Sequence, residues 1–327
     1  MPRLLDSARL APAQMRVAGV ALTLVALVAL GVLVAGSDWR EMIRPLAGAR
    51  WDWLAMAVGL AFGVEVAKTF RWLLLLGLLP ADLPRMLALV ITGRLLNVLA
   101  PLRAGDLWRV ASAARGEGRP LAIAGGSVVA EKLLDGAALG GAALGLLLPV
   151  DQRGLAALLL GATFAAAILV ALGVGVRIVH HLELGRWLAG TEPLRDPRRL
   201  AAVGGLSLLG LGLGLLVNLA VLEALAFPVA VTLGVAMLVS GYATALVPAG
   251  PGQLGVFELA VAASLMALGL PPASAVAAAL ALHLVLLSML LLAGTLSAPV
   301  GLLAHRHGDF DTRLADHHGD REELKGW

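Results

Sequence analysis

Blocks of about 20 or more apolar residues recur along this chain and restrict the folds open to it. A helix rises about 1.5 Å per residue, so about 20 apolar residues cross a bilayer core about 30 Å thick. Lipid offers the backbone no hydrogen-bond partners, and a helix satisfies its own N–H and C=O groups. Only 14% of the residues are charged, whereas a soluble chain carries roughly a quarter. The sequence therefore predicts an all-α polytopic membrane protein.

Six of the blocks are uninterrupted: residues 17–36, 53–79, 121–150, 155–176, 200–227 and 273–303. Two further stretches are broken: residues 86–114 around Pro101 and Gly105, and residues 229–270 around the run 247–252. A break at membrane depth is tolerated only where protein or a watery cavity covers the exposed backbone. We therefore expect six full crossings plus two re-entrant or broken-helix hairpins.

Basic residues predict the orientation, because loops rich in lysine and arginine stay in the cytoplasm. Arginines precede the first block, and others cluster in the connections at residues 103–119 and 177–199. The first block is longer than the apolar region of a signal peptide, about 7–15 residues, so we expect it to be retained. The prediction is a protein of the bacterial inner (plasma) membrane with both termini in the cytoplasm.

The composition changes sharply after Leu303. Residues 304–327 are charged, contain histidine and are almost free of apolar residues, which is typical of a disordered tail. We expect a transmembrane domain over residues 1–303 and a polar, disordered cytoplasmic tail over 304–327. Weak metal binding by the tail histidines is the less favoured alternative, since such tails are usually just soluble.

Several kinds of catalytic site have no basis in this sequence. The chain has no cysteine, which excludes thiolate nucleophiles and cysteine-bound metals. It also lacks an H-E-x-x-H motif, a nucleotide-binding P-loop and a G-x-S-x-G elbow. We therefore expect no enzyme activity, no cofactor, no metal and no nucleic-acid partner.

The two broken stretches match each other. Residues 101–107 and 248–254 both read Pro, three residues, Gly, a polar residue, Leu. Flanking positions also correspond: Asn97 with Thr244, Pro120 with Pro272, and Glu131 with His283. By the predicted orientation the two stretches enter from opposite sides, as in the inverted repeats of transporters. Repeat units over about 53–150 and 200–303 are favoured over chance, although Pro and Gly are common in such helices.

Charged residues inside apolar blocks are the candidate site residues, since each costs about 2.5–3.5 kcal/mol at a helix centre. Glu131 and His283 each lie eleven residues after a proline, roughly 16 Å along a helix and near the midplane. Glu131 and Asp135 share a helix face, and Lys132 does not. For Glu131 a site role and an ion pair with a neighbouring arginine stay open, whereas the ion pair is favoured for Asp135.

A second charged group lies in the block at residues 53–79. Glu65, Lys68 and Arg71 are spaced so that a local Glu65–Lys68 pair forms while Arg71 reaches the interface. This is the favoured interpretation for Arg71, and Glu65 is also a possible cavity residue.

The hairpins carry the remaining candidates. In the first, Arg94, Asn97, Arg103, Asp106 and Arg109 surround a Pro-Gly break. Arginine side chains and the free backbone N–H groups at a helix start both bind phosphate well. The phosphate of a phospholipid headgroup is therefore a suitable ligand. The alternative is that the arginines only enforce topology. The glycine-rich second hairpin adds the candidates Gln253 and Glu258.

These motifs, in this order, resemble a known family. The pattern Asn97-x3-Pro-x-Arg-x-Gly-Asp106-x2-Arg109, then Glu131-Lys-Leu-x-Asp135, then Pro-x-Gly-Pro-Gly-x-Leu-Gly-x2-Glu258 is similar to the flippase-like family named after the membrane region of lysylphosphatidylglycerol synthase. The resemblance spans residues 53–303. It implies a helical domain that moves lipids, often aminoacylated phospholipids, between leaflets. We expect no counterpart here of the aminoacyl-transferase domain that follows this region in the two-domain synthases, and His283 stands where many relatives have arginine.

The favoured function is therefore a flippase that transports a polar-headgroup lipid, such as an anionic phospholipid. Asn97, Arg103 and Arg109 would hold the headgroup, while Glu131 and His283 line the midplane and couple movement to protons. Two alternatives stay open. One is a secondary transporter of a small anionic or amino-acid-like solute, and the other is a non-catalytic partner of a lipid-synthesising enzyme.

Overall fold

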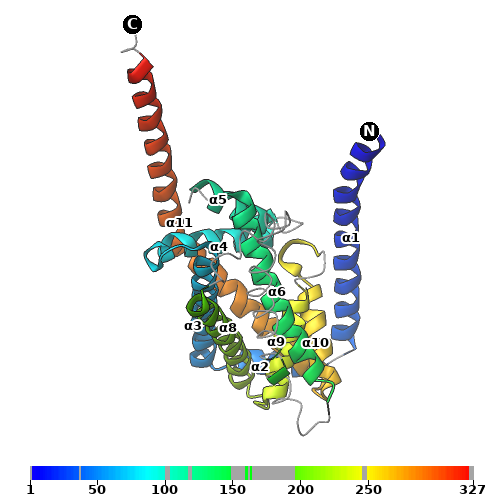
Figure 1. The fold of residues 1–327 in the computed structure, drawn as a ribbon. Coiled ribbons are helices and arrows are strands. Elements are labelled where there is room, and N and C mark those ends of the chain that lie inside the picture. Colours follow the sequence, from blue (N-terminus) through cyan, green and yellow to red (C-terminus); the bar gives the residue numbers. More distant parts are fainter. Residues whose placement is uncertain are drawn as a thin grey trace.

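The structure is a computed structural model that describes residues 2–36, 38–99, 104–116, 120–148, 159–160, 163, 196–244 and 249–323. These residues form helices and turns, with no strand among them (Figure 1). This confirms the predicted all-α fold. Helices form because lipid offers the backbone no partners, and each apolar segment must therefore satisfy its own N–H and C=O groups.

Three helices are apolar and long enough to cross a membrane: α3 (Trp51–Leu76), α8 (Pro197–Ala224) and the segment Pro272–Ser297 of α11 (Pro272–Glu323). They match three of the six predicted crossings. Helix α1 (Pro2–Ala35) and α2 (Trp39–Ala47) form a pair bent by 96°. Helix α6 (Leu121–Gly145) has 25 residues but is interrupted by charges. The predicted crossing at 155–176 lies almost wholly outside the described residues, so the count of six stays a prediction.

Each broken stretch forms a pair of short helices. The first contains α4 (Leu83–Leu99) and α5 (Ala104–Gly116), of 17 and 13 residues. The second contains α9 (Val231–Thr244), the 3₁₀ turn η5 (Pro251–Gln253) and α10 (Val256–Ala267); its two α-helices have 14 and 12 residues. At about 1.5 Å per residue none of the four spans a core about 30 Å thick. The helices end where Pro and Gly predict the breaks.

Equivalent helices of the two predicted repeat units run in opposite directions. The start of α3 meets the end of α8, where Arg50 N donates to Ala224 O at 2.9 Å. The end of α3 meets the start of α8, where Leu75 and Val203 share an apolar cluster. Helix α6 runs from α5 toward the end of the molecule that holds α2 (Figure 1). Helix α11 runs in the opposite direction, away from that end. These are the relations expected of an inverted repeat.

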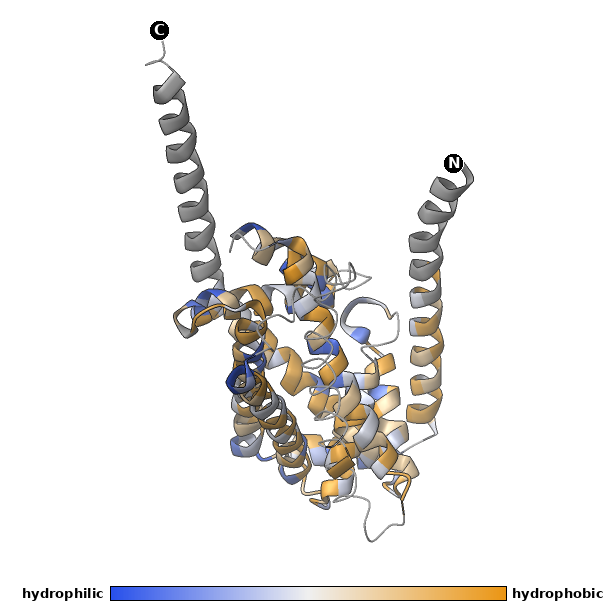
Figure 2. Cartoon of the chain, in the orientation of Figure 1, coloured by the Kyte–Doolittle hydropathy of each residue, from blue (hydrophilic) through white to orange (hydrophobic). Residues whose placement is uncertain are grey.

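The main core is built from small residues. Alanines of α3 and α11, among them Ala57, Ala61, Ala275 and Ala279, are buried together with side chains of α8 and α10. Small residues let helix backbones approach closely, which supplies van der Waals contact where lipid gives no hydrophobic driving force. Figure 2 shows apolar residues over most of the bundle and along α1, with hydrophilic residues inside it on α6.

The first hairpin is closed by a backbone contact between α4 and α5. A Cβ added to Gly105 would lie 1.8 Å from the Gly93 carbonyl oxygen and 2.8 Å from Asn97 Oδ1. Only glycine fits at this crossing, because any side chain would push the two helices apart. The predicted break at Gly105 is thus also the point of closest approach.

The backbone of α11 continues to Glu323, through the segment for which composition predicts a disordered tail. Its alanine, leucine, glutamate and arginine residues favour helix, and the segment contains no proline after Pro299. The end of α11 and the start of α1 lie on the same side of the molecule (Figure 1).

Candidate functional site

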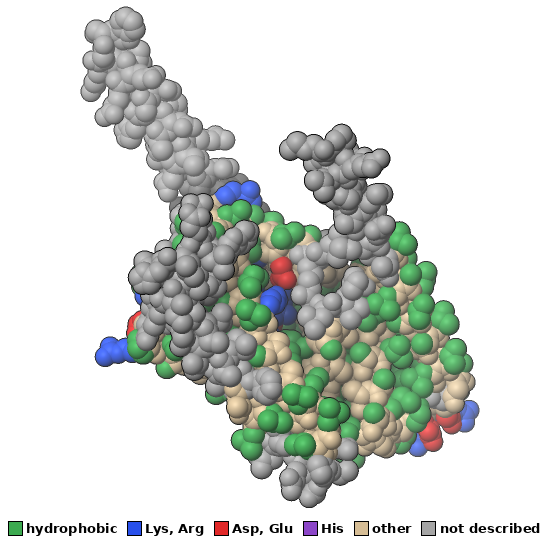
Figure 3. Space-filling view, turned by 45° about the vertical axis from the view of Figure 1, so that its right-hand side comes forward, with side chains coloured by type: hydrophobic (Ala, Val, Ile, Leu, Met, Phe, Trp, Pro, Cys, Tyr) green, Lys and Arg blue, Asp and Glu red, His purple; other side chains and the backbone are tan. Residues whose placement is uncertain are grey.

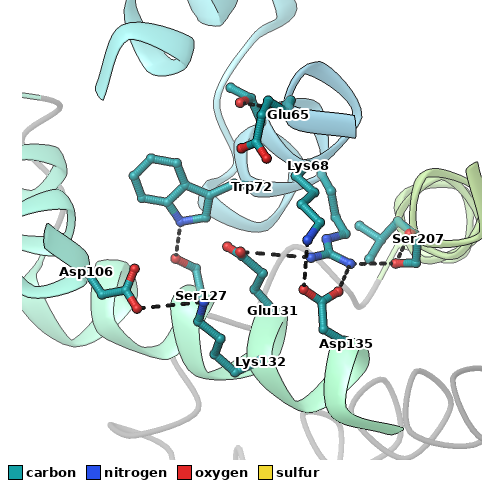
Figure 4. Close-up of polar contacts among 12 residues, drawn as sticks. Glu65, Lys68, Trp72, Asp106, Ser127, Glu131, Lys132, Asp135 and Ser207 are labelled. Carbon is teal, nitrogen blue, oxygen red and sulfur yellow. Dashed lines mark hydrogen bonds and ion pairs between the residues drawn. The ribbon is translucent and has the colours of Figure 1, made fainter. Parts of the chain in front are cut away.

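Charged side chains of four helices meet inside the bundle. We call this set the charged network: five cations, Lys68, Arg71, Arg94, Arg109 and Lys132, and four carboxylates, Glu65, Asp106, Glu131 and Asp135. They come from α3, α4, α5 and α6. Figure 4 shows Lys68, Glu131 and Asp135 pointing toward one another, with Ser207 approaching from α8.

Glu131 lies on α6 and links this helix to α5 and α3. Its Oε2 accepts from Arg109 Nη2 at 2.8 Å, and its Oε1 lies 4.0 Å from Arg71 Nη2. Glu131 is 3% exposed and Arg109 is 6% exposed. The Arg109 guanidinium also lies over the ring of Trp72, 4.4 Å from its centroid, which adds a cation–π contact. Trp72 in turn donates to Ser127 of α6 at 2.9 Å.

Asp135 pairs with two cations of α3. Its Oδ1 lies 2.7 Å from Arg71 Nη1, and its Oδ2 lies 3.5 Å from Lys68 Nζ. Arg71 Nη1 also donates to Ser207 Oγ of α8 at 3.1 Å. The expectation that Arg71 reaches the interface is wrong, since Arg71 is only 2% exposed. Carboxylates from α6 compensate its charge, which a single helix could not reveal.

The predicted local pair between Glu65 and Lys68 is also not formed. Glu65 Oε2 lies 2.6 Å from Arg94 Nε of α4 instead. Lys68 reaches the hydroxyl of Tyr242 on α9, and its Nζ lies 4.4 Å from that ring centroid. Both side chains thus bridge between helices, because cross-helix partners satisfy buried charges better than neighbours on one surface.

At the outer edge of the network, Lys132 Nζ lies 3.7 Å from Asp106 Oδ2, and the Lys132 side chain is 45% exposed. Asp106 Oδ1 accepts from Asn97 Nδ2 at 3.2 Å, and Asp106 N donates to Asn97 Oδ1 at 3.3 Å. These two hydrogen bonds tie the start of α5 to the end of α4.

The network has one more cation than carboxylates among the described residues. Arg71 Nε, Arg71 Nη2 and Arg109 Nε are buried and make no hydrogen bond within the described part of the chain. Arg71 also lines a small open recess, with room for about one water-sized molecule. The other lining residues are Lys68, Asp135, Leu139, Leu206, Ser207, Gly210, Leu211 and Tyr242. Unmet donors beside empty space, with a surplus positive charge, suit an anionic oxygen ligand.

Figure 3 shows blue and red side chains at the bottom of a hollow in an otherwise largely apolar face. Two network cations are partly exposed: Lys132, and Arg94, whose side chain is 41% exposed. Charge is therefore accessible from a largely hydrophobic surface (Figure 3).

The second hairpin repeats the closing contact of the first. Thr244 Oγ1 donates to Gln253 Oε1 at 2.8 Å, at the positions that match Asn97 and Asp106. Gly252 and Gly255 have φ of 65° and 80°, the left-handed region that favours glycine. Gly250 N donates to Thr23 Oγ1 of α1 at 2.7 Å, so the tip of this hairpin contacts the first helix.

Glu258 and His283 form a separate pair between α10 and α11. The distance from His283 Nδ1 to Glu258 Oε1 is 2.7 Å, and both residues are buried. Glu258 Oε2 accepts from Gly255 N at 2.7 Å, and the rings of His283 and Phe257 lie 4.5 Å apart. Among the described side chains, no hydrogen bond or ion pair joins this pair to the charged network.

The structure thus brings six of the sequence candidates into one network: Asp106, Arg109, Glu131 and Asp135, together with Arg94 and Glu65. Asn97 and Gln253 close the hairpins, Glu258 and His283 pair with each other, and Arg103 lies outside the described residues. Sequence reasoning left Lys68, Tyr242 and Ser207 out of the site. The one available signal was that Tyr242 is the only tyrosine of the chain.

A family model for the lysylphosphatidylglycerol synthase transmembrane region matches residues 16–294. The matched span contains every residue of the charged network and both hairpins. Neither the curated proteins nor the solved structures include a match to this chain.

Proposed function

Because the chain belongs to the lysylphosphatidylglycerol synthase transmembrane-region family, we propose that it is a lipid transporter that moves a polar-headgroup lipid between leaflets. The proposed site is the recess beside the charged network. The proposed activity breaks and forms no covalent bond, and the proposed location is the bacterial inner membrane.

One observation carries the proposal: Arg71 lines the recess, and two of its buried nitrogens lack hydrogen-bond partners among the described residues. A buried donor without a partner costs about 1–3 kcal/mol, and more when charged. An anionic oxygen of a headgroup would remove this cost and balance the surplus positive charge. Arginine suits phosphate in particular, because its planar fork matches two oxygens at once.

The surroundings of the recess favour a lipid as ligand. Leu139, Leu206 and Leu211 line it beside the charges, which suits a molecule with a polar head and an apolar body. The partly exposed Arg94 and Lys132 pair with buried or part-buried carboxylates of the network, so the network is accessible from outside. The short helices of the two hairpins are the elements that could move, because none of them spans the bilayer by itself.

The proposal is tested by reconstituting the purified protein into liposomes and measuring leaflet exchange of labelled anionic and zwitterionic phospholipids. We expect Arg71→Gln to slow exchange by about tenfold or more, which corresponds to about 1.4 kcal/mol of lost interaction. Arg71→Lys keeps the charge but loses the fork, so we expect an intermediate rate.

The matched control is Arg50→Gln, at the start of the same helix. Arg50 forms half-exposed ion pairs with Asp52 and Glu223, far from the recess, and its loss should leave exchange unchanged. If the wild-type protein exchanges none of the lipids, the proposed function is wrong. If Arg71→Gln and Arg50→Gln slow exchange equally, the proposed site is wrong.

A further inference from the structure

The pair of Glu258 and His283 links the same two elements in the second predicted repeat unit that Arg109 and Glu131 link in the first. In each unit the short helix after the break contacts the following long helix through one buried polar pair. In the first unit Arg109 of α5 contacts Glu131 of α6 at 2.8 Å. In the second, Glu258 of α10 contacts His283 of α11 at 2.7 Å.

The two pairs differ in one chemical property. Arginine stays protonated in proteins, so the first pair is a permanent ion pair with no net charge. Histidine changes charge between about pH 5 and 8. When its imidazole is neutral, the second pair carries the negative charge of Glu258; when the imidazole gains a proton, the second pair becomes an ion pair like the first.

Glu258 is held in place to serve as the partner of the imidazolium. Its Oε2 accepts from Gly255 N, and it lies in the first turn of α10, where the helix dipole interacts favourably with negative charge. Its Oε1 remains for His283 Nδ1. A proton added to the neutral imidazole goes to the ring, and Nδ1–H donates to Oε1 in the resulting ion pair.

Other charges do not compensate this pair. The helices packed around α10 and α11 carry described titratable groups: Arg40, Glu41 and Arg44 on α2, Asp52, Glu65, Lys68 and Arg71 on α3, Arg85 and Arg94 on α4, Arg198, Arg199 and Glu223 on α8 and Tyr242 on α9. Among these described side chains, none forms an ion pair with Glu258 or His283. One proton therefore decides the net charge of the pair.

We propose that Glu258 and His283 form a proton-binding site in the second repeat unit, and that proton binding there is coupled to movement of the second hairpin. The coupling rests on the proposed lipid transport, whereas the proton site stands without it. Glu258 contacts both His283 and Gly255 at the hairpin break. Proton binding replaces a hydrogen bond by an ion pair and so tightens the link between α11 and this break.

The proton site is tested by nuclear magnetic resonance of protein labelled with ¹⁵N-histidine in lipid nanodiscs. The chain has seven histidines, and the signal that His283→Gln removes identifies His283. We expect that signal to report proton binding to the ring when the pH is varied from about 8 to 5, and this response to change in Glu258→Gln. A His283 signal that stays constant over this range would overturn the proton site.

The coupling is tested by lipid exchange in liposomes as a function of pH. We expect the wild-type rate to change at least about fivefold across the titration. His283→Gln keeps the side chain neutral and His283→Arg keeps it charged, so both variants should exchange lipid at rates that no longer depend on pH. His317→Gln, in the polar tail, is the control and should keep the wild-type dependence.

The outcomes separate this inference from the proposed function. Wild-type exchange that does not depend on pH overturns the coupling and leaves lipid transport standing. A complete lack of exchange contradicts lipid transport, and the resonance titration then still decides whether His283 binds the proton.

Discussion

At the scale of single residues, the charged network works by mutual compensation. Arg109 and Glu131 are both buried, and each satisfies the other across two helices. Removing one partner of such a pair leaves an uncompensated charge and costs about 3–5 kcal/mol, whereas replacing both by apolar residues often costs little. A buried pair therefore acts more as a constraint on which helices pack than as a source of stability.

This predicts a non-additive mutant cycle. We expect Arg109→Leu and Glu131→Leu each to lower the free energy of unfolding by about 3–5 kcal/mol, and the double variant to lose less than the sum. Unfolding in mixed detergent micelles measures the three values. As a comparison, disrupting the half-exposed Arg50–Glu223 pair should cost about 1 kcal/mol or less. Additive losses at Arg109 and Glu131 would contradict the prediction.

At the scale of elements, the two predicted repeat units share a layout despite little identity in sequence. In each unit a hydrogen bond between residues nine apart closes the hairpin: Asn97 with Asp106, and Thr244 with Gln253. The preceding long helices, α3 and α8, pack against each other in opposite directions. Helix α4 of the first hairpin contacts α3, and α9 of the second contacts α8.

The antiparallel packing of α3 and α8 predicts which engineered cysteines form disulfides. The natural chain has no cysteine, so the background is zero. Arg50→Cys with Ala224→Cys should cross-link on oxidation, because the two backbones are joined by a 2.9 Å hydrogen bond. Leu75→Cys with Ala224→Cys should not, since Leu75 lies at the other end of α3. Gel mobility with and without a reductant reads the result, and the reverse pattern would indicate parallel helices.

At the scale of the whole molecule, the structure has two distinct ends. The start of α1 and the end of α11 lie at one end, and α2 lies at the other (Figure 1). Helix α2 begins with an Asp38 cap that accepts from Arg40 N at 2.8 Å, and its buried contacts with the main core come from Met42 and Leu46. Its exposed tryptophan and arginines suit a membrane interface.

The two ends predict a labelling pattern. We expect Ser7→Cys and Ala315→Cys to react with a membrane-impermeant maleimide only from the cytoplasmic side. Glu41→Cys on α2 should react only from the opposite side. Intact cells and inverted membrane vesicles give the two readings. Labelling of Glu41→Cys together with Ser7→Cys from one side would show that α1 does not cross the membrane.

The sequence alone determined the class of the protein, its long apolar helices and the places where two of them break, because these depend on hydropathy and on Pro and Gly. It also identified Asp106, Arg109, Glu131 and Asp135 as site candidates, because a charged residue within an apolar block can be recognised without knowledge of the fold. Only the tertiary structure decided the partners. A helical pattern shows neighbours on one surface, and so it predicted Glu65 with Lys68, whereas packing placed Glu65 beside Arg94 and Arg71 beside Asp135. Ion pairs between helices depend on how the helices are arranged in space, and that arrangement is a property of the whole fold.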